Sequence, residues 1–311
     1  MSFLAEMSLR LATAIETLDP TRRTAHGRFI IESMRPDGGF AGRQGPSDLY
    51  YTSFGLRCLA LLAVDSQDWA KHASQFLHTR LTPEPVGIDA LSWILSATLL
   101  EAVTGTSPFE TANLDRAETI RRWCHALRRP DGAYGKTPTA AVASTYQTFL
   151  ATACLEMIEE AGHEKKNQAE TNAVSVILSR KQTDGGFVEI PQVRSSGTNP
   201  TAAALSFLQI QDALSDEVRD RAVHFLASMQ TGNGGLLAHS KIPFPDLLST
   251  FTSLLTLDRL GALDTLDRHS AARFVKSLER PEGGFLAGHG DTAPDVEYTF
   301  YGLGSLAILG L

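Results

Sequence analysis

A short turn motif that recurs about every fifty residues constrains the fold of this 311-residue chain more than any other feature. Each clear copy combines an acidic or amide residue, glycine and a following apolar residue. The copies read PDGGF at 36–40, PDGAY at 130–134, TDGGF at 183–187, GNGGL at 232–236 and PEGGF at 281–285. Between 38 and 132 there is room for one more copy, and Pro83, Pro85 and Gly87 interrupt the chain midway. The spacing therefore predicts six repeats, a pattern typical of arrays of helix pairs.

Two kinds of helical segment flank the turns. The segment before a turn has apolar residues on one face, as in Phe29, Ile30 and Met34. The segment after it is apolar nearly all round, as in 51–62, 91–103, 202–208, 250–260 and 299–309. Alternation of these two types indicates an outer ring of helices packed on an inner ring.

We therefore predict an all-α fold, an α6/α6 toroid of six helix pairs that closes on itself. It forms one domain over residues 1–311. Its repeats start near residues 26, 73, 117, 172, 219 and 269, and an amphipathic helix at residues 1–20 precedes them.

Composition excludes several classes of protein. A net charge of -7 argues against a nucleic-acid partner, which needs a concentrated basic surface. No apolar run reaches the ~18 residues that span a bilayer. The N-terminal segment carries Glu6, Arg10 and Glu16, a pattern typical of an amphipathic helix rather than a signal peptide. Cys58, Cys124 and Cys154 are far apart and lie among apolar residues, which indicates reduced thiols. We expect a cytoplasmic protein without a transmembrane segment.

The Gly-Gly-Phe turns, each followed by a helix start of the form Pro-Asp-x-x-x-Thr, resemble one superfamily over residues 26–310. It contains the β subunits of protein prenyltransferases and the squalene-hopene and class II terpene cyclases. The resemblance implies a central cavity that holds an isoprenoid. Aromatic residues of the inner helices would then bind the substrate, and the alternative is that they are ordinary core: Tyr51, Trp93, Tyr146, Phe251 and Tyr301.

The zinc site of protein prenyltransferases is carried over only in part. That site uses an Asp, a Cys two residues later and a His in the last repeat. Here the Asp is Asp246, but Leu248 and Tyr298 stand at the other two positions. Leucine cannot replace the thiolate that zinc requires. We therefore predict no metal and no cofactor.

The diphosphate pocket of the family is also reduced in this sequence. His239 and Lys241 lie in the loop that would supply its basic residues, with Arg194 in the preceding loop. These three are predicted to bind substrate as a reduced anion site. The alternative is that they are exposed loop residues.

The resemblance to class II cyclases points to a proton donor. Those enzymes use the middle acid of Asp-x-Asp-Asp followed by Thr, and the segment 295–299 has the same shape, DVEYT, with Glu297 at the acid position. Asp295, Tyr298 and Asp246 complete the candidate catalytic group. A glutamic acid kept neutral by an apolar cavity can donate a proton.

A structural interpretation of the aspartates competes with the catalytic one. Asp48, Asp89, Asp246 and Asp295 each begin an inner helix, where aspartate is a favoured cap. In a toroid these helix starts share one mouth of the ring, and their positive dipole ends suit an anionic head group.

Three functions remain open at this point. The first is an isoprenoid-processing enzyme of the prenyltransferase or terpene cyclase type, acting on a polyprenyl (diphosphate) lipid without the family zinc site. The second is a catalytically inactive module that binds an isoprenoid or other amphipathic lipid. The third is an interaction module that engages a protein partner, or a second copy of itself, through its surface or the helix at 3–18.

Overall fold

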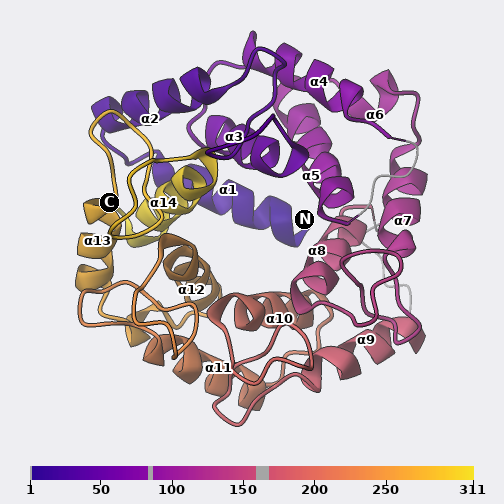
Figure 1. The fold of residues 1–311 in the computed structure, drawn as a ribbon, viewed down its shortest axis with the longest axis vertical. Coiled ribbons are helices and arrows are strands. Elements are labelled where there is room, and N and C mark those ends of the chain that lie inside the picture. Colours follow the sequence, from indigo (N-terminus) through magenta and orange to yellow (C-terminus); the bar gives the residue numbers. More distant parts are fainter. Residues whose placement is uncertain (1, 83–86, 159–167) are drawn as a thin grey trace.

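The computed structural model describes residues 2–82, 87–158 and 168–311, and these residues form a closed ring of helices in two layers (Figure 1). The inner layer contains α3 (Leu49–Leu61), α5 (Gly87–Thr104), α8 (Thr145–Glu156), α10 (Thr198–Ile210), α12 (Leu247–Arg259) and α14 (Val296–Leu309). The outer layer contains α2 (Pro20–Ser33), α4 (Trp69–Thr79), α7 (Arg116–Ala126), α9 (Gln168–Leu178), α11 (Asp216–Ser228) and α13 (Arg268–Ser277). The short helix α6 (Pro108–Thr111) and the 3-10 turn η1 (Leu263–Thr265) connect pairs. The predicted all-α toroid is confirmed.

The ring closes because its last inner helix packs on its first. α14 contacts α12 on one side and α3 on the other, and α3 continues the inner layer to α5 and α8. We call the contact of α13 and α14 with α2 and α3 the seam. The predicted interruption at Pro83 and Pro85 lies outside the described residues.

At four of the recurrent turns a glycine of positive φ fits the outer-to-inner connection against the next outer helix. Gly234 and Gly283 have φ values of +94° and +104°, and a Cβ there would lie 2.1 Å from the Ser270 carbonyl oxygen and 2.3 Å from the Ala25 carbonyl oxygen. Only glycine combines this backbone conformation with such close approach. Ala25 belongs to the first repeat, so the sixth turn completes the ring.

The threonine of each helix start has a matching structural role. The amide of Phe187 donates to Thr201 Oγ1 at 2.8 Å, and the amide of Phe285 donates to Thr299 Oγ1 at 3.2 Å. These bonds satisfy buried backbone donors at the point where the chain enters the inner layer. The motif and the helix start that follows it therefore work as one unit.

The seam adds a polar network to this unit. Glu282 replaces the Asp or Asn of the other turns, and the amide of Gly284 donates instead to His26 Nδ1 at 3.0 Å. The other ring nitrogen of His26 lies 3.1 Å from Glu279 Oε1. Arg22 donates to both oxygens of the same carboxylate, at 2.8 and 2.7 Å.

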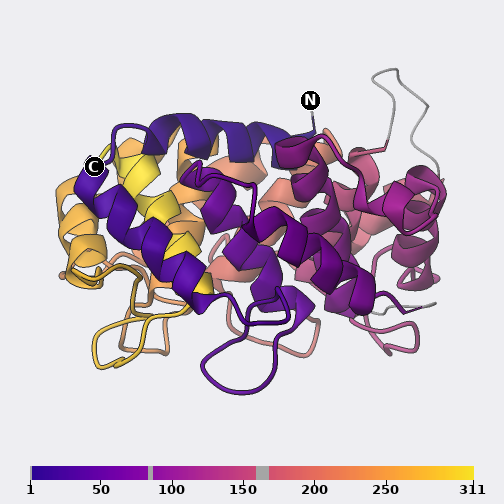
Figure 2. The same ribbon diagram turned by 90° about the horizontal axis from the view of Figure 1, so that it is seen from above.

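The helix α1 (Phe3–Ile15) lies across one end of the ring, while the long outer-to-inner loops project from the opposite end (Figure 2). It contacts α14, α3 and α8 and buries Phe3, Leu11 and Ile15. The ring of Phe3 packs edge-on against Phe149, with a centroid distance of 5.7 Å. The apolar face predicted for this segment thus packs against the inner helices of the same chain. Because α1 lies across one end of the ring, we call the opposite end, where the loops project, its mouth.

One described helix, α5, is long and apolar enough to cross a membrane by length and composition alone. Half of that stretch is buried in the structure, where α5 packs against α3, α4, α7 and α8. Its apolarity is explained by its place in the inner layer.

Candidate functional site

Each inner helix is covered by its two neighbours and by the outer layer, so the side that remains faces the axis of the ring (Figure 1). On α12 this side shows as a stripe of half-buried residues at spacings of four, three and four: Leu248, Thr252, Leu255 and Arg259. Such a stripe follows the helical period.

Glu297 and two tyrosines form a polar cluster at the seam. Glu297 lies in the first turn of α14 and is 9% exposed. Its Oε1 accepts hydrogen bonds from Tyr50 Oη of α3 at 2.6 Å and from Tyr301 Oη, one turn further along α14, at 3.0 Å. Its other oxygen, Oε2, accepts no hydrogen bond from a described residue.

The surroundings of Glu297 act on its pKa in opposite directions. Burial raises the pKa of Glu297 above its usual value, and the hydrogen bonds from Tyr50 and Tyr301 act against this rise. The same bonds stabilise the carboxylate that remains after proton release. Burial also raises the pKa of both tyrosines, so they stay protonated as donors.

Aromatic rings and one arginine extend this cluster along the ring interior. Phe54 packs against Phe300 and Tyr301 with centroid distances of 5.7 and 5.4 Å. The guanidinium carbon of Arg57 lies 4.5 Å from the centroid of Phe54 and 5.0 Å from that of Phe300. Sequence reasoning missed Arg57, although a basic residue inside the apolar segment 51–62 was a visible signal.

Tyr146 lies in the first turn of α8 and is 40% exposed. Burial nevertheless raises its pKa. The charges of Arg57 and Glu297 both act on the pKa of Tyr146.

Asp246 and Asp295 serve as helix caps. Asp246 accepts from the Ser249 amide at 2.7 Å and from Ser249 Oγ at 2.9 Å, so both of its oxygens are committed. Asp295 accepts from the Tyr298 amide at 2.9 Å and from Arg43 Nε at 3.1 Å. Burial raises the pKa of both carboxyls. The capping interpretation therefore describes their contacts.

The residues at the zinc positions of protein prenyltransferases do not fit a zinc ion. The carboxylate of Asp246 is engaged by Ser249, Leu248 offers no donor atom, and Tyr298 has its pKa raised to about 12 by burial and nearby carboxylates. Because Tyr298 resists ionisation and Leu248 has no donor atom, these positions do not supply the ligands that a zinc ion requires.

Three of the remaining predicted residues surround the Glu297 cluster. Tyr298 packs edge-on against Tyr301 at 5.8 Å, Phe251 stacks on Tyr301 at 5.4 Å, and Tyr51 packs edge-on against Tyr50 at 5.3 Å.

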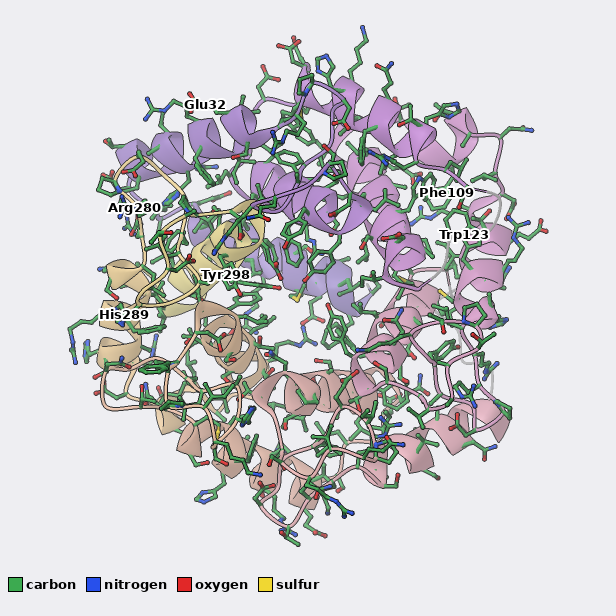
Figure 3. The ribbon with its side chains drawn as sticks, in the orientation of Figure 1. Glu32, Phe109, Trp123, Arg280, His289 and Tyr298 are labelled. Atoms are coloured by element: carbon green, nitrogen blue, oxygen red, sulfur yellow. The ribbon has the colours of Figure 1, made fainter. Side chains whose placement is uncertain are left out.

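Trp93 lies elsewhere. It is 1% exposed, and its Nε1 donates to the Leu77 carbonyl at 2.9 Å. Its ring packs against Phe109 and Trp123, which lie toward the outer layer (Figure 3). Trp93 thus belongs to the wall between the two layers and does not face the axis.

The three basic candidates lie on the loops at the mouth. Arg194 and Lys241 are exposed, and His239 is half-buried, with its Nδ1 accepting from the Lys241 amide at 3.2 Å. None of them contacts the Glu297 cluster.

A family model for the prenyltransferase alpha-alpha toroid domain matches residues 2–82 and 201–311. The chain belongs to this family. No curated protein matches the sequence. Family membership accounts for the two-layer ring and its recurrent turns.

Solved structures share this fold at low sequence identity. A protein geranylgeranyltransferase-I from Candida albicans, complexed with GGPP, has a TM-score of 0.71 and 14% identity over 92% of this chain and 90% of that chain. A variant of the type II terpene cyclase MstE from Scytonema, in complex with its substrate geranylgeranyl dihydroxybenzoate, has a TM-score of 0.63 and 16% identity over 98% and 99%. A glycosidase variant in complex with glucose has a TM-score of 0.58 and 12% identity over 95% and 98%. These similarities show the fold, and function must be argued from the site.

Proposed function

We propose that this toroid is an isoprenoid-processing enzyme of the terpene cyclase type, in which Glu297 donates a proton to a polyprenyl lipid held on the ring axis. The observation that carries the proposal is the arrangement of Glu297. One carboxyl oxygen is held by two tyrosine hydroxyls, while the other accepts no hydrogen bond from a described residue. An acid placed in this way has a proton to give and a stabilised anion to leave behind.

The ring interior supports an apolar lipid as the substrate. The half-buried stripe of α12 and the exposed side of Tyr146 point to a hollow along the axis. Phe54, Phe251 and Phe300 are buried and pack against one another and Tyr301, so the Glu297 cluster has apolar and aromatic surroundings. Two structurally similar proteins have been solved with geranylgeranyl compounds, which favours an isoprenoid over a sugar.

The proposed reaction conserves atoms and charge. The proton on Glu297 Oε2 adds to a double bond of the polyprenyl chain, whose π electrons form the new C–H bond. The cation that results is consumed when a further double bond of the same chain attacks it. Water takes up a proton from the cyclised cation, which gives a neutral isomer of the substrate, and the Glu297 carboxylate regains a proton from water before the next cycle. The faces of nearby aromatic rings stabilise the cation.

Asp295 and Asp246 have positioning roles in this proposal. By capping α14, Asp295 fixes the first turn that carries Glu297, and Arg43 holds Asp295 in turn. Asp246 caps the neighbouring helix α12 in the same way. Tyr298 and Tyr51 pack around the cluster and restrict water at the mouth side.

Transfer of the isoprenoid to a cysteine thiol is a poorer fit. That chemistry uses zinc to form the thiolate, and the residues at Asp246, Leu248 and Tyr298 do not fit the metal. The proposed enzyme acts without zinc.

The test is product analysis in D₂O. Purified protein is incubated with geranylgeraniol, geranylgeranyl diphosphate, a geranylgeranyl hydroxybenzoate and squalene, and the extracts are analysed by chromatography and mass spectrometry. We expect a cyclic isomer of one substrate that carries one solvent-derived deuterium. Glu297→Gln should reduce its formation by about 10²- to 10⁴-fold.

Two results would contradict the proposal. A product that forms equally well with Glu297→Gln would remove the proton donor. Tight binding of a polyprenyl lipid that is never converted would instead establish a binding module, which the loss of the family zinc ligands favours as the second candidate.

A further inference from the structure

Two neighbouring loops at the mouth carry exposed apolar side chains. Phe244 is 75% exposed, more than any other large apolar side chain in the described part of the chain. Ile242 in the same loop and Val193 in the preceding loop are also exposed. We call the fully exposed segments 191–194 and 240–244 the loop tips. Apolar side chains that are exposed together mark an interaction surface, whereas single ones need no explanation.

Hydrogen bonds hold the two loops side by side. Thr198, the first residue of α10, directly follows the first loop, and its amide and hydroxyl donate to the carbonyl oxygens of Ala238 and Leu237 in the second, at 2.9 and 2.6 Å. Ser240 of the second loop and Thr183 of the turn before the first line one open groove beside α11. The loops of this end project away from α1 (Figure 2), so the two tips belong to one outward surface.

The turn that carries these residues does not require an apolar side chain. The amides of Val193 and Ile242 each close a turn by donating to a carbonyl oxygen three residues earlier, at 3.1 and 3.0 Å. In the sixth repeat the amide of Asp291 closes the same turn, and its carboxylate pairs with Arg43. The apolar residues of the fourth and fifth repeats are therefore not explained by the loop fold.

The backbone around Phe244 is stiff. Pro243 and Pro245 flank it, and each proline fixes its own φ and restricts the residue before it. A Cβ at Gly235 would lie 2.7 Å from Pro245, so the second proline is packed against the recurrent turn. Because this segment is already ordered, little conformational entropy is lost when the exposed ring is buried against a partner.

The charge of the loop tips is opposite to that of the whole chain. The tips contain Arg194 and Lys241 and no acidic residue, whereas the chain has a net charge of -7. The carboxylates that flank the tips, Glu189 and Asp246, are half-buried and accept hydrogen bonds from amides at the starts of α8 and α12. Basic residues beside exposed apolar ones suit an anionic lipid surface, because the head groups attract the charges and the acyl boundary accepts the apolar groups.

We propose that the loop tips dock on the surface of an anionic lipid bilayer, with Phe244 entering the boundary between head groups and acyl chains. The mouth of the ring then faces the membrane. The passage of a polyprenyl lipid from the bilayer into the ring rests on the function proposed above, whereas the docking surface does not.

Co-sedimentation of the full chain with vesicles tests this surface. Neutral vesicles contain phosphatidylcholine, and anionic vesicles contain phosphatidylcholine and phosphatidylglycerol at about 2:1. We expect binding to anionic vesicles to be about tenfold tighter than to neutral ones and to weaken as salt is raised. Phe244→Ser should weaken binding to anionic vesicles about tenfold. Lys241→Gln should weaken it about fivefold and leave the weak binding to neutral vesicles unchanged.

Two matched controls lie on α1, at the opposite end of the ring. Leu9→Ser removes an apolar side chain that is 57% exposed, and Arg10→Gln removes one positive charge. Each should change vesicle binding less than about twofold. Phe244→Trp should keep the binding and shift its fluorescence emission to the blue with anionic vesicles, because the native tryptophans are buried and report little of this surface. Unfolding midpoints show whether each variant is folded.

Three results would overturn the docking surface. The first is a folded, unmodified protein that does not bind anionic vesicles. The second is a loss with Leu9→Ser as large as that with Phe244→Ser. The third is dimerisation that Phe244→Ser abolishes, without vesicle binding, which would assign the tips to a second copy of the chain.

Turnover without vesicles separates this proposal from the isoprenoid function. Phe244→Ser should convert a dispersed polyprenyl substrate at the rate of the unmodified protein. If vesicle binding failed while this turnover was present, the docking surface would be wrong and the isoprenoid proposal would stand. Phe244-dependent vesicle binding without conversion of any polyprenyl substrate would support the surface and contradict the enzyme.

Discussion

The seam and the joint between the fourth and fifth repeats use the same turn, but they differ in what lies between their inner helices. At the seam, Glu297 joins two tyrosines, and His26 and Arg22 meet Glu279. At the other joint, α10 packs on α12, and the amide and hydroxyl of Thr198 donate to carbonyls of the next loop. The seam therefore includes ionisable side chains that are largely shielded from solvent. The contacts named at the other joint involve uncharged groups.

This difference shows which polar groups closure can explain. The network of Arg22, His26 and Glu279 lies at the turn, where it replaces the acceptor that Asp or Asn supplies elsewhere. The group of Glu297, Tyr50 and Tyr301 lies on the inner helices, where the fourth–fifth joint needs nothing comparable. Ring closure therefore explains the network of Arg22, His26 and Glu279. It does not explain the group of Glu297, Tyr50 and Tyr301, for which we propose a functional role.

The largest expected effect concerns what the two joints share. Gly185→Ala and Gly283→Ala each place a Cβ against a backbone carbonyl at positive φ, and each should reduce the free energy of unfolding by about 3 kcal/mol or more. Gly232→Ala, which meets nothing within 4 Å, is the matched control and should change it by less than about 0.5 kcal/mol. Denaturant unfolding measures all three. A tolerated alanine at 283 alone would show that the seam closes by its polar network instead.

The second prediction separates the two joints by pH. The hydrogen bonds of His26 and Arg22 lower the pKa of Glu279 to about 2, against the opposing effect of burial. Because the folded-state pKa lies below the unfolded value, the ionised carboxylate stabilises the fold above about pH 4.5, and this is lost as pH falls towards 2. The contribution is about 3 kcal/mol.

The free energy of unfolding measured from pH 7 downward should therefore fall more steeply for the unmodified protein than for Glu279→Gln. Glu217→Gln removes an exposed carboxylate that pairs with Lys181 near the other joint, and its curve should follow that of the unmodified protein. Parallel curves for the unmodified protein and Glu279→Gln would show that the seam pair contributes no pH-dependent stability.

The sequence predicts the ring because its signals are local and repeated. Thr299 bonds within its own turn and helix start, and Gly283, although it packs against another repeat, recurs at a fixed place in the turn, so their spacing alone shows the repeat. The capping roles of Asp246 and Asp295 were foreseen for the same reason, since a cap acts on the next three residues.

The site is less accessible from sequence. Tyr50 meets Glu297 across 247 positions of the chain, and Arg43 meets Asp295 across 252. No local pattern reports such pairs, because they form only when the ring closes. The sequence does not show that Trp93 points toward the outer layer rather than the axis. A helix that is apolar all round has no polar face to show which side lies outward.

The third prediction sharpens the functional part of the comparison. Tyr50→Phe or Tyr301→Phe removes a donor that stabilises the Glu297 carboxylate, and each should reduce turnover about tenfold. The pKa of Glu297 should then rise further, so activity, which needs the protonated acid and is lost as pH rises through this pKa, should persist to higher pH.

Ser228→Ala, on the outer helix α11 of the other joint, is the control and should leave both the rate and the pH profile unchanged. If the two tyrosine variants lowered the rate without moving the profile, their role would be packing alone.

The smallest expected effect comes from the mouth loops, where Arg194 and Lys241 are exposed and lie outside both joints. Arg194→Ala and Lys241→Ala should change turnover or binding of a polyprenyl lipid in solution by less than about twofold at physiological salt, because exposed charges are screened over about 8 Å. Measurement at low salt tests the reason, since weak steering of an acidic ligand would grow there. A loss of tenfold or more at either position would place a head group of the ligand among the loops, and the interpretation of these two residues as exposed loop residues would fail.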